Sequence, residues 1–260
     1  AAPPVAPRAA GALAGDLPAA VVVNLARRAD RWEEVNARLS KLGGLRFERW
    51  EAVDGASAEI PRDVVADRWS TARNWRYVVR AFEGGEDCGY VQKELPLTVG
   101  ERGCAASHVR IWEHCARRAD AAGPHAGALL VLEDDALPKV GFLARLRTAL
   151  ADLRAEAPDV LYLGYTQAAP WRRSVSAAVR EAEYLWTTVG YVLWPSGARK
   201  LLAGLPVDQP VDNFMSNLMA GGTLRGFALV PAAVKQAKEW NVDNDVAHSD
   251  DVAWVQNCSA

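Results

Sequence analysis

Apolar and polar positions follow two rhythms along the chain, and the two rhythms alternate. Short continuous apolar runs, such as Ala20 to Leu25 and Gly127 to Leu132, are typical of strands that are buried on both faces. Other segments carry apolar residues three or four positions apart, as Trp32, Val35 and Leu39 do, which indicates helices with one buried face. Strands that alternate with helices predict one α/β domain built on a parallel sheet.

The same pattern gives the expected order of elements. We predict strands at residues 20–25, 45–50, 127–132, 159–163, 184–194 and 224–230, and helices at 27–42, 100–122, 140–153, 195–202 and 211–219. The strand at 184–194 is expected to be two short strands or one bent strand, and the strand at 224–230 is expected to close the sheet.

Three segments fall outside this alternation. Residues 57–96 follow neither rhythm and are expected to form an irregular excursion over the sheet, and the role of the Trp-rich stretch 69–91 stays open. Residues 1–18 have the Ala- and Pro-rich composition of a linker or disordered start. We therefore expect a single domain over residues 19–260.

Composition and charge limit the classes of function that the chain could have. The chain has 260 residues, half of them hydrophobic, and its 30 basic and 32 acidic side chains give a net charge of −2. This balance does not predict a nucleic-acid partner or an anionic membrane surface. Apolar runs also stay shorter than the ~20 residues that span a bilayer, so we expect no transmembrane segment. The four cysteines show no CxxC pair.

Three adjacent acids, Glu133, Asp134 and Asp135, come directly after the most apolar strand. Ligands in open α/β sheets bind beyond the carboxyl ends of strands, and alternation along a strand puts Glu133 and Asp135 on the same side. Two carboxylates on one side form an oxygen site that suits Mg²⁺ or Mn²⁺. The alternative is a solvated turn whose acids cap the following helix, and the motif alone does not decide between them.

A second polar group follows the first predicted strand. Asn24 and Leu25 precede three arginines, Arg27, Arg28 and Arg31, which could bind phosphate oxygens in pairs. Taken alone, these arginines are better explained as solvated charges on a helix.

A third group lies near the start of the helix predicted at 100–122. Cys104, His108 and Cys115 lie on one helical stripe, which would allow a zinc site but lacks further ligands at suitable spacing. A half-buried histidine on a core face is the preferred interpretation. In the polar tail, His248 and Asp250 are either loop residues or late metal ligands on a mobile segment.

Seven motifs in order carry a resemblance to a known family. They are VVVNLARRADRW, FERWEAVDG, LTVGERGCAASHVRIWEH, ALLVLEDDALP, DVLYLGY, TTVGYVLWPSGARKLL and PVDNFM, within residues 21–250. In this order the chain resembles glycosyltransferase family 25, which includes bacterial lipooligosaccharide galactosyltransferases and galactosyltransferases that act on collagen hydroxylysine.

The resemblance implies a fold, a donor and a cation. The expected fold is glycosyltransferase-A-like, a mixed and mainly parallel sheet flanked by helices. The donor is expected to be a UDP-sugar, usually UDP-galactose, and the cation Mn²⁺ or Mg²⁺. The acid triplet matches the family's acidic motif, so Glu133 and Asp135 are the expected metal ligands, with His248 and Asp250 from the tail.

The remaining site residues follow from the same resemblance. The expected donor-binding residues come from the three groups: Asn24, Leu25, Arg28, Arg31, Ser107, His108, Glu133 and Asp134. An inverting transfer also needs a base opposite the leaving group. Asp212 in PVDNFM matches the family's aspartate and is our first choice, with Asp208 second.

Two functional classes stay open. The first is an active hexosyltransferase, whose acceptor is a glycan or the hydroxylysine of a collagen-like protein. The second is a same-fold binding or adhesion module without transfer activity. A metal-dependent phosphatase or nuclease ranks third, because it would need more scattered acids and histidines. A collagen-type acceptor would indicate the endoplasmic reticulum or Golgi lumen, and a bacterial type the cytoplasm.

Overall fold

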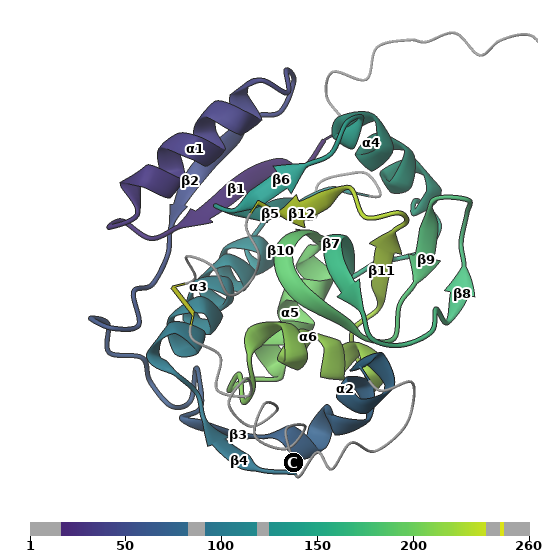
Figure 1. Cartoon of the computed structure of the whole chain (residues 1–260). Coiled ribbons are helices and arrows are strands. Elements are labelled where there is room, and N and C mark those ends of the chain that lie inside the picture. The colour runs from purple at the N-terminus through teal and green to yellow at the C-terminus, as the bar shows by residue number, and fades with distance from the viewer. Residues whose placement is uncertain (1–16, 83–91, 119–124, 238–244, 247–260) are drawn as a thin grey trace, which may run out of the picture.

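The protein is built around one large central sheet (Figure 1). The structure, a computed structural model, describes residues 17–82, 92–118, 125–237 and 245–246. Eight strands lie in the order β2-β1-β5-β10-β7-β11-β9-β8. Their bounds are β1 Ala19–Asn24, β2 Phe47–Glu51, β5 Leu129–Glu133, β7 Val160–Gln167, β8 Arg173–Ser174, β9 Val179–Glu181, β10 Leu185–Leu193 and β11 Gly226–Leu229.

The strand directions bring the ends of β1 and β5 together. β1 is parallel to both β2 and β5, β11 is parallel to β7, and β10 runs antiparallel between β5 and β7. Strands β2, β1, β5, β7 and β11 therefore share one direction, which confirms the mixed, mainly parallel sheet. Asn24 and Glu133, the last residues of β1 and β5, consequently lie at the same edge, where α/β sheets bind ligands.

Helices cover both faces of this sheet. Figure 1 shows α1 (Ala29–Ser40) and α4 (Phe142–Asp152) on one side, and α3 (Val99–Ala116), α5 (Pro195–Ala203) and α6 (Val211–Ala220) on the other. Leu130 and Leu132 of β5 pack in the hydrophobic core between the sheet and the helices α1 and α4. Leu129 and Val131 pack in the core between the sheet and the helices α3, α5 and α6. Two covered faces explain why β5 is apolar at successive positions. Burial of each such side chain contributes about 1.5–3 kcal/mol.

Several short elements differ from the sequence prediction. Residues 57–96 are not wholly irregular, because β3 (Arg68–Ser70) pairs with β4 (Glu94–Pro96), and a 3₁₀ turn and α2 (Trp75–Phe82) follow β3. The sheet also does not close at β11, since β9 and β8 extend it. A second small pair joins β6 (Ala136–Pro138) to β12 (Val234–Gln236). Strands of two or three residues are too short to show a period of their own.

One strand bends where it reaches the sheet's ligand-binding edge. The pairing of β10 with β7 shifts register between Trp186 and Gly190, which confirms one bent strand. Within this bend Thr187 has a φ of 75°, a left-handed conformation that a β-branched residue rarely adopts. Such strain persists only where the surroundings enforce it, and it is concentrated at functional sites.

Across the described part of the chain, each helix is too short or too polar to cross a membrane.

Candidate active site

A cavity of about 680 Å³ lies beside this edge of the sheet. The end of β1, the first turns of α3, the acid triplet, the bend of β10 and the start of α6 all line it. Asn24, Leu25 and Arg31 therefore share one cavity with Ser107 and His108, as the sequence analysis expects. Their role in donor binding stays a prediction.

All three acids of the triplet line the cavity, but strand alternation is the wrong reason. β5 ends at Glu133, and Asp134 and Asp135 form the turn that leads into β6. The turn gives each carboxylate a different set of partners.

Asp134 is neutralised within the protein. Its carboxylate lies 2.5 Å from the Arg31 guanidinium and accepts a hydrogen bond of 2.7 Å from the Asn24 amide. Burial raises the pKa of Asp134, and Arg31 and Asn24 oppose that rise. Asp134 therefore holds the β1 and β5 groups together, because its charge is already matched.

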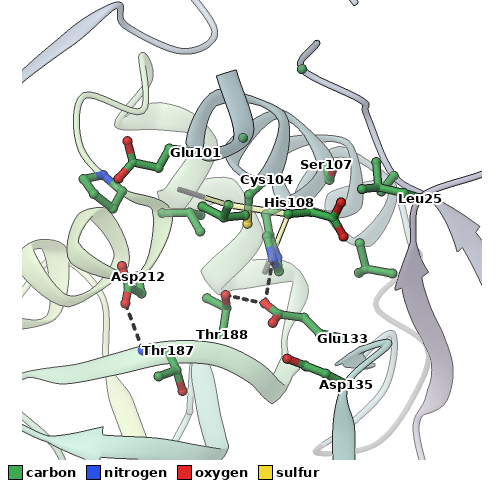
Figure 2. A pocket seen from close by; sticks show the side chains of 18 of the residues that line it. Leu25, Glu101, Cys104, Ser107, His108, Glu133, Asp135, Thr187, Thr188 and Asp212 are labelled. Atoms are coloured by element: carbon green, nitrogen blue, oxygen red, sulfur yellow. Dashed lines mark hydrogen bonds and ion pairs between the residues drawn. The ribbon is translucent and has the colours of Figure 1, made fainter. Parts of the chain in front are cut away.

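Glu133 is held from two sides (Figure 2). Thr188 of β10 donates a 2.6 Å hydrogen bond to Glu133 Oε1, and His108 Nε2 lies 3.5 Å from the same oxygen. Burial acts to raise the pKa of Glu133, but His108 and Thr188 outweigh it, and the pKa lies below its ordinary value. Glu133 is therefore anionic near neutral pH. His108 is fully buried rather than half-buried, and it also faces this site.

Asp135 is the least satisfied member of the triplet. Its Oδ2 accepts a 3.3 Å hydrogen bond from Gln236 and lies 3.6 Å from Arg31, while Oδ1 is buried without a hydrogen-bond partner. Burial, and then the charge of Glu133, raise the pKa of Asp135 to about 7. An unpaired, buried carboxylate oxygen beside a second carboxylate suits a hard divalent cation. Glu133 and Asp135 are thus the residues that fit such a metal.

The three arginines after β1 converge on one anion. Arg27, Arg28 and Arg31 lie 2.7, 2.6 and 3.3 Å from the carboxylate of Asp245. Arg27 and Arg31 also line the cavity, whereas Arg28 stands behind the lining and pairs with Asp30 as well. A cluster that already binds one carboxylate has the geometry to bind phosphate oxygens.

Asp212 borders the opposite part of the cavity, at the start of α6. Its Oδ2 accepts a 3.0 Å hydrogen bond from the Thr187 backbone, and Oδ1 accepts one of 2.8 Å from Asn213. The strained bend of β10 thus orients this carboxylate. Asp208 lies outside the cavity lining and pairs with Arg73.

Two further predicted ligands, His248 and Asp250, lie outside the residues that the structure describes.

Sequence reasoning missed several lining residues. Trp186 is held by a 3.0 Å hydrogen bond from its indole to Asn213, and it packs edge-on against Tyr184. Asn74 is buried, and its side-chain oxygen has no hydrogen-bond partner. Nothing in the sequence around Asn74 indicates that it lines the cavity. Trp186 could have been found, because it immediately precedes the TTVGYVLW motif.

The sequence places Cys104, His108 and Cys115 on one helical stripe and offers no further metal ligand at a suitable spacing. The structure supplies one, because Cys104, His108 and Glu133 offer ligand atoms within 4.8 Å of one another. Burial and the nearby carboxylates, Glu133 first, raise the pKa of the Cys104 thiol well above its usual range. Cys115 is buried elsewhere, near the carbonyl of Leu193.

Comparison with known proteins gives a consistent result. Residues 18–186 match the family described as glycosyltransferase family 25 (LPS biosynthesis protein). The chain is 34% identical over 207 residues to human "Inactive glycosyltransferase 25 family member 3", covering 75% of this chain and 30% of that protein. It is 30% identical over 203 residues to the Drosophila melanogaster "Glycosyltransferase 25 family member", covering 75% and 29%.

A third relative is zebrafish "Procollagen galactosyltransferase 1", at 34% identity over 128 residues, or 46% of this chain and 20% of that protein. The chain therefore aligns with less than a third of the length of each of these relatives.

Proposed function

The chain belongs to glycosyltransferase family 25, and from this premise we propose that it transfers a hexose from a UDP-sugar to an acceptor hydroxyl with the help of a divalent cation. The observation that carries the proposal is the pairing, in one cavity, of an unsatisfied carboxylate at Asp135 with arginines that converge on an anion. A nucleoside diphosphate with its cation needs both. Galactose is the first choice of hexose, because one relative is named a galactosyltransferase.

The two charged groups divide the work of binding the donor. Arg27 and Arg31 would hold phosphate oxygens, for which Asp245 stands in within the structure. Glu133 and Asp135 would hold Mn²⁺ or Mg²⁺, as their oxygen ligands suit either ion. A cation bound there offsets the negative charge that develops on the departing diphosphate.

Asp212 is the proposed base for the acceptor hydroxyl. Figure 2 shows Asp212 and Thr187 on one side of the cavity, and Glu133 and Asp135 on the other, with Thr188 between them. A base that lies across the cavity from the cation site is the arrangement that an inverting transfer requires. The hydrogen bonds from Thr187 and Asn213 fix the carboxylate, so that it would accept the proton without first rotating.

The lining around Asp212 offers both apolar surface and hydrogen-bond acceptors to an acceptor substrate. Trp186 and Val78 contribute apolar surface, and Asn74 contributes an oxygen that lacks a donor. A buried amide oxygen that lacks a hydrogen bond costs about 1–3 kcal/mol of stability. An acceptor hydroxyl that donates a hydrogen bond to the Asn74 side-chain oxygen would therefore bind favourably.

The second candidate is a same-fold binding or adhesion module without transfer, which the human relative named inactive favours. The acids at 133, 134, 135 and 212 are all present in this chain, which favours the enzyme. For an active transferase, two classes of acceptor are possible. The name of the zebrafish relative suggests a collagen-like acceptor, and the family description suggests a lipopolysaccharide glycan.

One assay tests the proposal. The protein is incubated with UDP-galactose or UDP-glucose and Mn²⁺, alone and with a hydroxylysine peptide or lipid-linked glycans. We expect UDP release that depends on an acceptor and stops with a chelator, with the product identified by mass spectrometry. Cation-dependent UDP binding without transfer to any of these acceptors would favour the binding module instead.

A further inference from the structure

A second set of ligand atoms lies next to the carboxylate site. Cys104 and His108 are four residues apart on α3, so their side chains lie one helical turn apart on the same face. Glu133 approaches them from the end of β5, and the three ligand atoms lie within 4.8 Å of one another. Figure 2 shows the His108 ring between Cys104 above it and the Glu133 carboxylate below it.

His108 is oriented as a metal ligand would be. Its Nδ1 is hydrogen bonded to the Tyr191 hydroxyl at 2.8 Å, which fixes the ring. Its Nε2 is buried and points at the Glu133 carboxylate, whose nearest oxygen lies 3.5 Å away, too far for a good hydrogen bond. An outer hydrogen bond on one ring nitrogen, with the second nitrogen directed at other ligand groups, is the usual arrangement of a ligating histidine. The side chain is only 1% exposed, so the long contact with Glu133 satisfies Nε2 poorly unless a closer partner binds it.

The chemistry of the three ligands points to a softer ion than the carboxylates do. A thiol, an imidazole and one carboxylate form the kind of mixed set that binds Zn²⁺ or Co²⁺, whereas Mg²⁺ and Mn²⁺ prefer oxygen. All three residues line the cavity, so an ion can reach them and keep an open fourth position.

We propose that Cys104, His108 and Glu133 form a site for a thiophilic divalent ion such as Zn²⁺, and that this ion excludes the cation of the donor site. The exclusion rests on the proposed function, because both sites draw on Glu133. Zinc is therefore expected to inhibit donor binding.

The first test uses Co²⁺ alone and needs no donor. The starting protein carries the substitutions Cys88→Ser and Cys258→Ser, so that Cys104 and Cys115 are its only thiols. We expect one equivalent of Co²⁺ to give the near-ultraviolet absorption of a thiolate-to-cobalt transition, which Zn²⁺ then displaces. Cys104→Ser should remove this absorption, and the matched control Cys115→Ser should keep it.

Absence of the absorption from the starting protein, or its survival in Cys104→Ser, would overturn the site. If Cys104→Ser does not fold, alkylation of Cys104 in the starting protein decides the question. Zn²⁺ should then protect Cys104 from iodoacetamide by about tenfold or more in rate, and an unchanged rate would overturn the proposal. Failure of these tests leaves the proposed glycosyltransferase untouched, because UDP takes no part in them.

The second test measures the exclusion. UDP is titrated into the starting protein with Mn²⁺, before and after one equivalent of Zn²⁺. We expect Zn²⁺ to weaken UDP binding about tenfold or more in the starting protein and to have no effect in Cys104→Ser. Zinc that binds at Cys104 yet leaves UDP affinity unchanged would refute the exclusion.

Discussion

Asp135 gives the sharpest prediction about stability, because its surroundings oppose its charge when no cation is bound. Its pKa rises from an ordinary 3.8 to about 7, chiefly through burial and the neighbouring Glu133. We expect Asp135→Asn to stabilise the metal-free protein above pH 7, although it removes an acid from the candidate active site.

The sign follows from proton linkage. As the pH rises from about 4 to about 7, the unfolded chain releases the Asp135 proton while the folded protein retains it. The free energy of unfolding therefore falls over this window, by up to about 4 kcal/mol when the pKa difference is converted at 1.36 kcal/mol per pH unit. Asparagine does not titrate, so the free energy of unfolding of the variant should not fall for this reason over the same pH window. Below pH 4 the two proteins should have similar stability.

Urea denaturation in the presence of a chelator, at pH 5 and pH 8, measures the effect. Asp30→Asn is the control of opposite sign, because the hydrogen bond from Arg28 lowers the pKa of the Asp30 carboxyl to about 2. It should leave the free energy of unfolding at pH 8 unchanged or lower it, and it should not stabilise the protein. Mn²⁺ should stabilise the unaltered protein and leave Asp135→Asn unaffected. If Asp135→Asn is less stable than the unaltered protein at pH 8 without metal, the argument about Asp135 is refuted.

Three other substitutions test separate parts of the cavity. Asp212→Asn should lower turnover about 10²–10⁴-fold with UDP and Mn²⁺ affinity unchanged by calorimetry, and near-normal transfer would move the base to another carboxylate. His108→Ala should weaken UDP binding while the protein still melts cooperatively; a folded fraction with intact affinity would assign His108 to the core alone. Trp186→Ala should raise the KM for the acceptor without changing the affinity for UDP. The control Trp75→Ala, at an exposed position outside the cavity lining, should change neither quantity. Equal effects of the two substitutions on the acceptor KM would contradict an acceptor role for Trp186.

The order of strands and helices could be predicted because burial leaves a periodic trace. β5 is apolar at successive positions since both of its faces are covered, and α3 begins at the capping box of Thr98 and Glu101. The short pair of β3 and β4 left no such trace. Trp69 in β3 is buried in the main core, and that contact depends on residues far away in the sequence.

The members of the site were more predictable than their partners. The acid triplet and the helical stripe of Cys104 and His108 are both visible as local patterns. The contact of Asn24 with Asp134, 110 residues away, depends on the parallel pairing of β1 with β5. The bend that brings Thr188 to Glu133 depends on a strained backbone at Thr187, which no local pattern indicates.

Calorimetric titration with UDP, with Mn²⁺ and with a chelator, tests whether this cavity binds a nucleoside diphosphate through a cation held by the acid triplet. We expect Mn²⁺ to raise the affinity for UDP at least about tenfold, or 1.4 kcal/mol, in the unaltered protein and to have no such effect in Asp135→Asn. Equal affinity for UDP with and without Mn²⁺ in the unaltered protein would contradict the proposed site.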